Sequence, residues 1–252
     1  AYPSSYRMVI SDEANGYRYD VYDMETFDKL NTYETLSRDV IFLPDNRFIQ
    51  YSLYDKRLSL HDGKTGDETA ALEDIELDTF TLSQDGALLA LALKDKTLKL
   101  YNVEKGFSQV LTLSELKHPA TRLIFSPDTK HLYIGLDDYS VAIYTIPDGR
   151  LTGTIEMGDA LKKVIFSADG NQVMLVTLNG SQLWNIPAFK QLAAMDYIYD
   201  LDSSFQTILV AWNDETLFIP VYDTRMLLAE AEKQLNGRVL TEKERKTLFI
   251  EP

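Results

Sequence analysis

Four aspartates recur at matching places along the sequence. Asp55, Asp95, Asp138 and Asp214 each stand seven residues before the end of a stretch such as "DKRLSLHD", in which apolar and polar residues alternate. A ring of converging carboxylates could supply the general acid and the general base of a hydrolase or a lyase. Whether these acids converge depends on the elements that carry them.

The rest of the sequence offers little to a metal ion, a cofactor or a nucleophile. His61, His118 and His131 are far apart in the sequence, and the chain has no cysteine. Disulfides, thiolate zinc sites and cysteine nucleophiles are therefore excluded. The "GKT" at residues 63–65 is interpreted as a turn, because Leu58 stands where a phosphate loop has its first glycine. We expect no cofactor, no metal and no catalysis.

The charge balance narrows the choice of partners. The 252 residues carry a formal net charge of −14, whereas a nucleic-acid footprint is basic. We expect a protein or peptide partner, with basic character favoured, and neither nucleic acid nor a membrane surface. No apolar run is long enough to span a membrane. We expect a cytoplasmic location, with the periplasm as the alternative.

A second series of aspartates shows how the chain repeats, with a period of about 40 residues. Asp45, Asp85, Asp128 and Asp169 lie in the related turns "FLPDNRF", "LSQDGAL", "FSPDTKH" and "FSADGNQ". Pro-Asp and Asp-Gly between apolar runs are typical of hairpins. Each period predicts four short strands, and such a sheet covers its faces only by stacking on its neighbours. The sequence predicts an all-β β-propeller of six or seven four-stranded blades.

These segments resemble the WD-repeat family of β-propellers over residues 8–222. "FSPDTKHLYIGLDDYSVAIYTI" is similar to the inner strands of the family, and "LWN" at 183–185 to its Trp-Asp dipeptide. The family's tryptophan position is degenerate, holding His61, Tyr101, Tyr144 and Trp184. The resemblance implies that His118 is a hydrogen-bond partner in a blade connection. It also implies structural roles, as caps of the turn between the second and third strands, for Asp55, Asp95, Asp138 and Asp214.

The end of the chain follows another pattern. Apolar residues at helical spacing run from Leu227 to Leu235, and "TEKE" at 241–244 is typical of a helix start. We expect a propeller over residues 1–222 and a helical tail over 223–252 that packs on the propeller or docks to a neighbouring domain. The tail resembles the end of WD-repeat regions in large bacterial signalling or defence proteins, at Leu240, Thr241, Glu244, Arg245 and Phe249. Because the chain begins with Ala1, we expect a longer protein.

Two stretches are candidates for partner binding. The first is a turn, formed by Asp137, Asp138 and Tyr139. The second is the acidic segment 67–78, with Glu73, Asp74, Glu76 and Asp78, which is either a solvated strand edge or a docking patch for a basic partner. We predict a non-enzymatic protein-binding or sensing platform that acts through the loops at one propeller end. The alternatives are a propeller-type hydrolase or lyase with acids in its channel, and a purely structural repeat.

Overall fold

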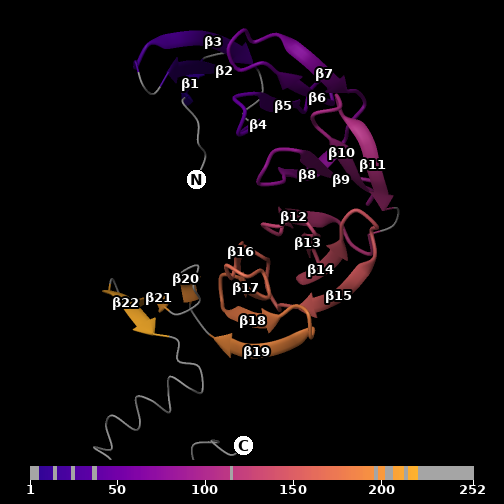
Figure 1. Cartoon of the computed structure of the whole chain (residues 1–252), viewed down its shortest axis with the longest axis vertical. Coiled ribbons are helices and arrows are strands. Elements are labelled where there is room, and N and C mark those ends of the chain that lie inside the picture. The colour runs from indigo at the N-terminus through magenta and orange to yellow at the C-terminus, as the bar shows by residue number, and fades with distance from the viewer. Residues whose placement is uncertain are drawn as a thin grey trace, which may run out of the picture. The chain divides into compact units, whose positions relative to one another are not determined.

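The computed structural model describes residues 6–13, 16–23, 26–35, 39–113, 116–195, 198–201, 207–212 and 215–220. These residues form strands and turns, which confirms the predicted all-β class (Figure 1). The predicted helical tail, residues 223–252, and the turn residue Asp214 lie outside the described residues. The chain divides into two compact units, Ala1–Val164 and Ile165–Pro252.

The first unit holds one three-stranded sheet and three four-stranded sheets. All four are antiparallel, and their strands follow chain order. The first sheet contains β1 (Tyr6–Glu13), β2 (Gly16–Asp23) and β3 (Lys29–Thr35). The second contains β4 (Asp39–Phe42), β5 (Phe48–Ser52), β6 (Arg57–His61) and β7 (Glu68–Leu72). The third contains β8 (Leu77–Leu82), β9 (Leu88–Leu93), β10 (Leu98–Asn102) and β11 (Ser108–Leu113). The fourth contains β12 (Ala120–Phe125), β13 (His131–Leu136), β14 (Ser140–Thr145) and β15 (Leu151–Glu156).

Two further sheets follow along the chain. The fifth contains β16 (Lys163–Phe166), which begins before the division between the units, β17 (Gln172–Val176), β18 (Ser181–Asn185) and β19 (Lys190–Met195). The sixth contains β20 (Ile198–Leu201), β21 (Thr207–Trp212) and β22 (Glu215–Pro220). The six sheets of the described ranges agree with the repeat count read from the sequence.

Stacking between neighbouring sheets creates the core of the first unit. Five of the six residues of β9 are buried, because apolar residues stand on both faces of this strand. One core cluster joins the second sheet to the third, with Ile49, Leu58 and Leu91 among its members. Another joins the third sheet to the fourth, through residues such as Leu100 and Ile134. The third sheet is therefore covered on both faces, as the sequence pattern requires.

A serine and an aspartate close the turn between the first two strands of a sheet. The Ser83 hydroxyl donates to Asp85 Oδ1 (2.6 Å) and accepts from the Leu88 amide (2.9 Å), and Asp85 Oδ1 also accepts from the Ala87 amide (3.0 Å). The corresponding Ser126–Asp128 and Ser167–Asp169 pairs make the same contacts. Each turn thus satisfies its own backbone donors, which fixes the register of the following hairpin.

The last strand of each sheet from the first to the fifth carries one residue more than its partner. The pairing shifts at this point in every such strand pair, and the extra residues are Leu30, Thr69, Val110, Thr152 and Leu192. An extra residue of this kind bends the strand and interrupts its ladder, which discourages edge-to-edge association.

Candidate functional site

In the four-stranded sheets of the first unit, the turns between the second and third strands lie at the same end as the connections to the neighbouring sheets. We call it the connection end. Alternate turns share an end because each sheet is antiparallel and in chain order. Backbone hydrogen bonds join the turns to the connections there: Ile75 to Lys56 (2.7 Å), Lys94 to Glu76 (2.9 Å), Leu116 to Lys96 (3.0 Å), Asp137 to Pro119 (3.0 Å) and Met157 to Tyr139 (3.1 Å), amide to carbonyl. The backbone of this end is therefore fixed by a repeating set of contacts.

The structure places three of the four predicted turn aspartates at the connection end. Asp95 Oδ1 accepts from the Thr97 amide (2.9 Å), and Asp138 Oδ1 accepts from the Ser140 amide (3.1 Å) and hydroxyl (2.7 Å). These hydrogen bonds hold the pKa of Asp95 and that of Asp138 below the ordinary value. Asp55 differs, since its carboxylate accepts from the Ser52 hydroxyl (2.6 Å).

The turn 137–139 presents an exposed aromatic ring on a fixed backbone. Tyr139 has a φ of 67° and a relative exposure of 51%. Its neighbours Asp137 and Asp138 flank His118, whose Nδ1 lies 3.2 Å from Asp137 Oδ1 and whose Nε2 lies 3.3 Å from Asp138 Oδ2. His118 stands in the connection between the third and fourth sheets. The structure thus brings the predicted connection histidine to this candidate turn.

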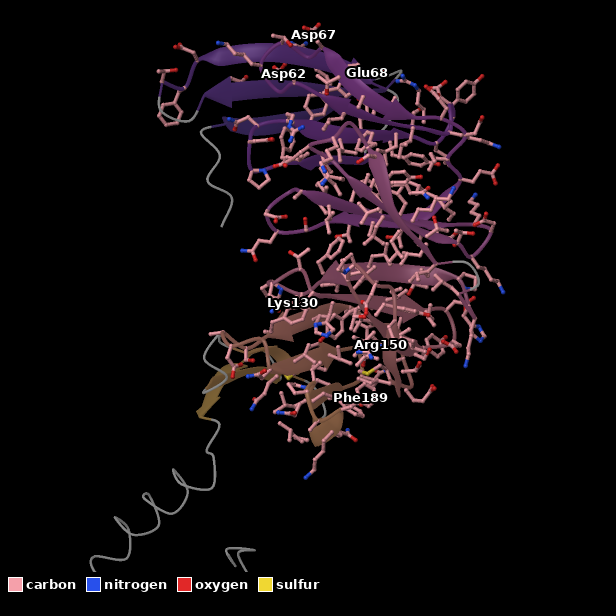
Figure 2. The ribbon with its side chains drawn as sticks, turned by 45° about the vertical axis from the view of Figure 1, so that its right-hand side comes forward. Asp62, Asp67, Glu68, Lys130, Arg150 and Phe189 are labelled. Carbon is pink, nitrogen blue, oxygen red and sulfur yellow. The ribbon has the colours of Figure 1, made fainter. Side chains whose placement is uncertain are left out.

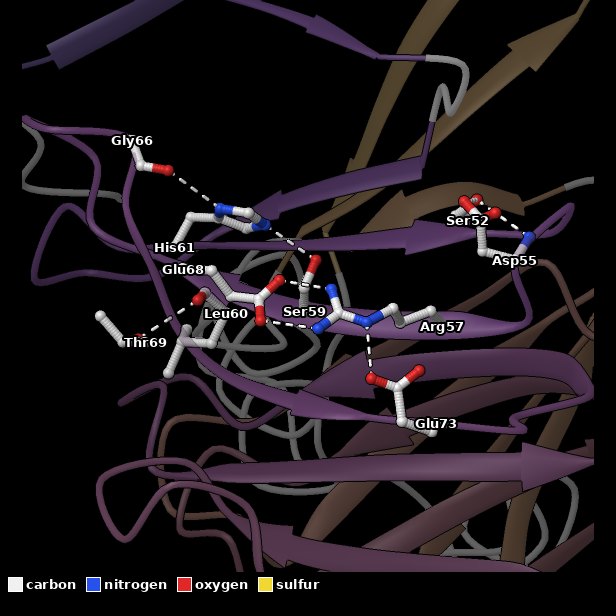
Figure 3. A network of polar contacts seen from close by, with 10 residues as sticks. All are labelled: Ser52, Asp55, Arg57, Ser59, Leu60, His61, Gly66, Glu68, Thr69 and Glu73. Carbon is white, nitrogen blue, oxygen red and sulfur yellow. Dashed lines mark hydrogen bonds and ion pairs between the residues drawn. The ribbon is translucent and has the colours of Figure 1, made fainter.

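The acidic segment 67–78 includes the last strand of the second sheet and the connection that follows it. All six of its acids are exposed, and Asp67 and Glu68 lie at its start (Figure 2). Arg57, on the neighbouring strand β6, lies between two of these acids: its Nη2 donates to Glu68 Oε1 (2.6 Å) and its Nε to Glu73 Oε1 (2.7 Å) (Figure 3). Lys56 Nζ donates to Glu76. Two basic residues therefore offset part of the negative charge.

These pairs change the acidity of their members. The Arg57 guanidinium lowers the pKa of Glu68, and the Lys56 ammonium lowers the pKa of Glu76. Asp78 behaves in the opposite way: partial burial raises its pKa, the charge of Lys94 opposes the rise, and the charge of Asp137 adds to it. Asp78 is the extra residue in the pairing of β8 with β9, between Leu77 and Thr79.

Sequence reasoning missed the two basic residues and an apolar pair beside them. Leu53 and Tyr54 are 67% and 87% exposed, in the turn between β5 and β6. Lys56 and Arg57 follow in the same turn and strand. The sequence "SLYDKR" could have indicated this surface, because it places a leucine and a tyrosine in a turn whose counterparts in the third and fourth sheets are "KDK" and "DDY".

Several turn carboxylates of the described sheets are engaged in hydrogen bonds within their own turns. Hydrogen bonds lower the pKa of turn carboxylates such as Asp85, Asp95 and Asp138, and an acid of lowered pKa is a poor proton donor near neutral pH. Among the side chains that the structure describes, no three His, Asp or Glu residues are placed to hold a metal ion. The described ranges also contain no helix long and apolar enough to cross a membrane.

The stacked antiparallel sheets of the described residues have the fold of a β-propeller, a class built from four-stranded sheets. A chain in the crystal structure titled "Crystal Structure of Mitotic Checkpoint Complex" matches with a TM-score of 0.63 and 18% sequence identity. The match covers 87% of this chain and 72% of that chain. At this identity the likeness concerns the fold, and it confirms the predicted propeller. No family model matches the sequence.

Proposed function

We propose that this chain is a non-enzymatic platform that binds a protein or a peptide through its connection end. The observation that carries the proposal is that this end combines a hydrogen-bonded backbone with exposed apolar and aromatic side chains. The connections and turns are joined by repeated backbone hydrogen bonds, whereas Leu53, Tyr54 and Tyr139 project into solvent. Exposed aromatic rings on a fixed backbone lose little conformational entropy on binding, and such rings are frequent anchors of protein interfaces.

The opposite end of the sheets is a less suitable surface. Its turns carry charged residues such as Asp62, Lys130 and Arg150 (Figure 2), and several of its carboxylates are occupied by the turn itself. Asp62 Oδ1, for example, accepts from the Lys64 and Thr65 amides, both at 2.8 Å. The apolar and aromatic side chains of Leu53, Tyr54 and Tyr139, each more than half exposed, lie instead at the connection end. Asp137–Tyr139 and the acidic residues Glu73, Asp74, Glu76 and Asp78 are all near the connection end, which supports placing the binding surface there.

The finer features of the proposal concern the biological setting. The platform works as a sensing or signalling module of a larger protein or complex, and the turn aspartates Asp55, Asp95 and Asp138 hold its loops in shape. The negative net charge favours a basic partner. A cytoplasmic location and a bacterial signalling context stay predictions from the sequence, which cell fractionation and genomic context would test.

Site-specific photo-crosslinking tests which end binds. A benzophenone amino acid replaces Tyr54 or Tyr139 at the connection end, or Lys130 or Arg150 at the opposite end, in the full chain in its native cells. We expect a discrete cross-linked species from the first pair and none from the second. Cross-links confined to the opposite end, or the same diffuse pattern from both ends, would contradict the proposal. All four positions are exposed or half-exposed, so the substitutions should leave the fold intact.

A further inference from the structure

The turn between β5 and β6 is built differently from its counterparts. The Ser52–Arg57 pair encloses four residues, 53–56, whereas the hydrogen bond from the Leu93 amide to the Thr97 carbonyl encloses three, 94–96. The first two residues of the longer turn are Leu53 and Tyr54, which are 67% and 87% exposed. A lone exposed apolar residue is common on protein surfaces, but here two adjacent large side chains are exposed in the same enlarged turn. We call this pair the Leu53–Tyr54 patch.

Acidic residues lie in the turn that carries this patch and in the connection bonded to that turn. The hydrogen bond from the Ile75 amide to the Lys56 carbonyl (2.7 Å) holds the connection 73–76 against the turn. Within the turn, the next residue and this connection, four carboxylates stand against two cations: Asp55, Glu73, Asp74 and Glu76 against Lys56 and Arg57. Both cations are already engaged, Lys56 with Glu76 and Arg57 with Glu68 and Glu73. Asp74 has no ion pair within the described part of the chain, so the surroundings of the patch stay net negative.

We propose that the Leu53–Tyr54 patch binds a segment of another protein in which an apolar side chain stands beside a lysine or an arginine. The inference rests on the proposed function and names the chemistry of its partner. The apolar side chain covers Leu53, and the cation lies over the Tyr54 ring and near the Asp74 carboxylate, where cation–π and Coulomb attraction act together.

The charge of the patch also argues against a second copy of this chain as the occupant. A symmetric pair of copies brings identical surfaces together. The net negative surroundings of each patch would then face one another, and like charges at an interface are unfavourable. A basic segment instead meets opposite charge at the same place. Its binding is accordingly expected to weaken as salt concentration rises.

Fluorescence anisotropy with two labelled hexapeptides tests the inference on the full chain. One probe alternates leucine with arginine, and the other alternates leucine with glutamate. We expect the arginine probe to bind at least tenfold more tightly than the glutamate probe. The double variant Leu53→Ser/Tyr54→Ser should weaken the arginine probe at least tenfold, and Asp74→Asn should weaken it severalfold. Phe27→Ser is the matched control, since Phe27 is 73% exposed in a turn at the other end of its sheet, and it should change affinity less than twofold.

Each remaining outcome has a defined meaning. Equal binding of both probes, or no binding of either, overturns the inference. Loss of arginine-probe binding in Tyr139→Ser but not in the double variant overturns the inference and leaves the proposed platform standing. Loss only in variants of the opposite end overturns both. A dimer in light scattering that the double variant converts to monomer assigns the patch to a second copy and also overturns the inference. Unchanged circular dichroism of each variant shows that the fold is retained.

Discussion

Tyr51 links the second sheet to residues 73–76, the connection to the third sheet, at the connection end. Its side chain is 5% exposed, and its hydroxyl donates to the Ile75 carbonyl (2.9 Å) and lies 3.4 Å from the Leu77 amide. Ile75 is itself buried, so few other partners can reach its carbonyl. The Tyr51 ring also packs at a tilt against Phe80, with 6.5 Å between the ring centroids. One hydroxyl therefore fixes the connection from inside the core.

Replacing Tyr51 by Phe removes the hydroxyl and keeps the ring. A buried carbonyl that loses its donor costs about 1–3 kcal/mol, and the retained ring packing adds no cavity term. We expect Tyr51→Phe to lower the free energy of unfolding by about 1–2 kcal/mol. For a chain of this size, each kcal/mol corresponds to about 2–4 °C in melting temperature. Tyr54→Phe, three residues along the chain, should change neither value, because Tyr54 is 87% exposed.

Urea denaturation followed by circular dichroism measures the global effect, and amide hydrogen exchange measures the local one. Exchange at the Ile75 and Leu77 amides should be faster in Tyr51→Phe than in the wild-type protein, because the hydroxyl no longer holds the connection. A Tyr51→Phe protein as stable as Tyr54→Phe, with unchanged exchange at these two amides, would refute the reasoning. The connection would then be held by its backbone contacts alone.

Three more predictions concern turns. Thr129 has a φ of 59° where the third and fifth sheets use Gly86 and Gly170, and a β-branched residue is strained there, so Thr129→Gly should stabilise the protein by about 0.5–1 kcal/mol in urea denaturation. A Cβ on Gly149 (φ 68°) would lie 2.7 Å from Leu113 Cδ2, whereas one on Gly158 (φ 76°) meets nothing within 4 Å; Gly149→Ala should therefore cost about 2 kcal/mol and Gly158→Ala about 1. The hydroxyl of Ser83 lowers the pKa of Asp85 in the folded protein. The Asp85 carboxylate therefore stabilises the fold fully above its unfolded pKa of about 4, and this stabilisation is lost as the pH falls through its folded pKa. The stability gap between wild type and Asp85→Asn, measured by urea midpoints, should be constant near neutral pH and close below about pH 4. Equal costs at the two glycines, a destabilised Thr129→Gly, or a gap that persists in acid would contradict the respective argument.

The strands and turns were predictable because they depend on local pattern. "LLALAL" from Leu88 became a buried strand, and Asp85 and Asp128 cap turns as their spacing indicated. The apolar runs and turn motifs each act within a few residues, and they recur in every repeat. The six sheets could therefore be counted from the sequence.

The ion pairs of the candidate site could not be predicted in the same way. Arg57 contacts Glu68 and Glu73, which are 11 and 16 residues away in the sequence. The extra residue Thr69 shifts the pairing beside this contact, so that Glu68 stands opposite His61. The placement of Asp78 depends on a similar shift between β8 and β9. The sequence gives no consistent signal for these shifts, because the extra residues of the last strands share no single residue type: they are Leu30, Thr69, Val110, Thr152 and Leu192.

The degenerate tryptophan position explains how the repeats diverge without losing the fold. His61 stacks on Phe48, with 4.9 Å between ring centroids, and its Nε2 lies 2.8 Å from Ser59 Oγ (Figure 3). At the same position in the fifth sheet, Trp184 Nε1 donates to Gln182 Oε1 (3.0 Å). In both sheets a flat ring takes its polar partner from two residues earlier on the same strand, so ring and partner can change together. The fold depends instead on the capped turns at the opposite end and on the buried middle strands. The turns of the connection end are then free to vary, and their variation from the second sheet to the fourth, "LYDK", "KDK" and "DDY", is what a binding surface with several distinct contact points requires.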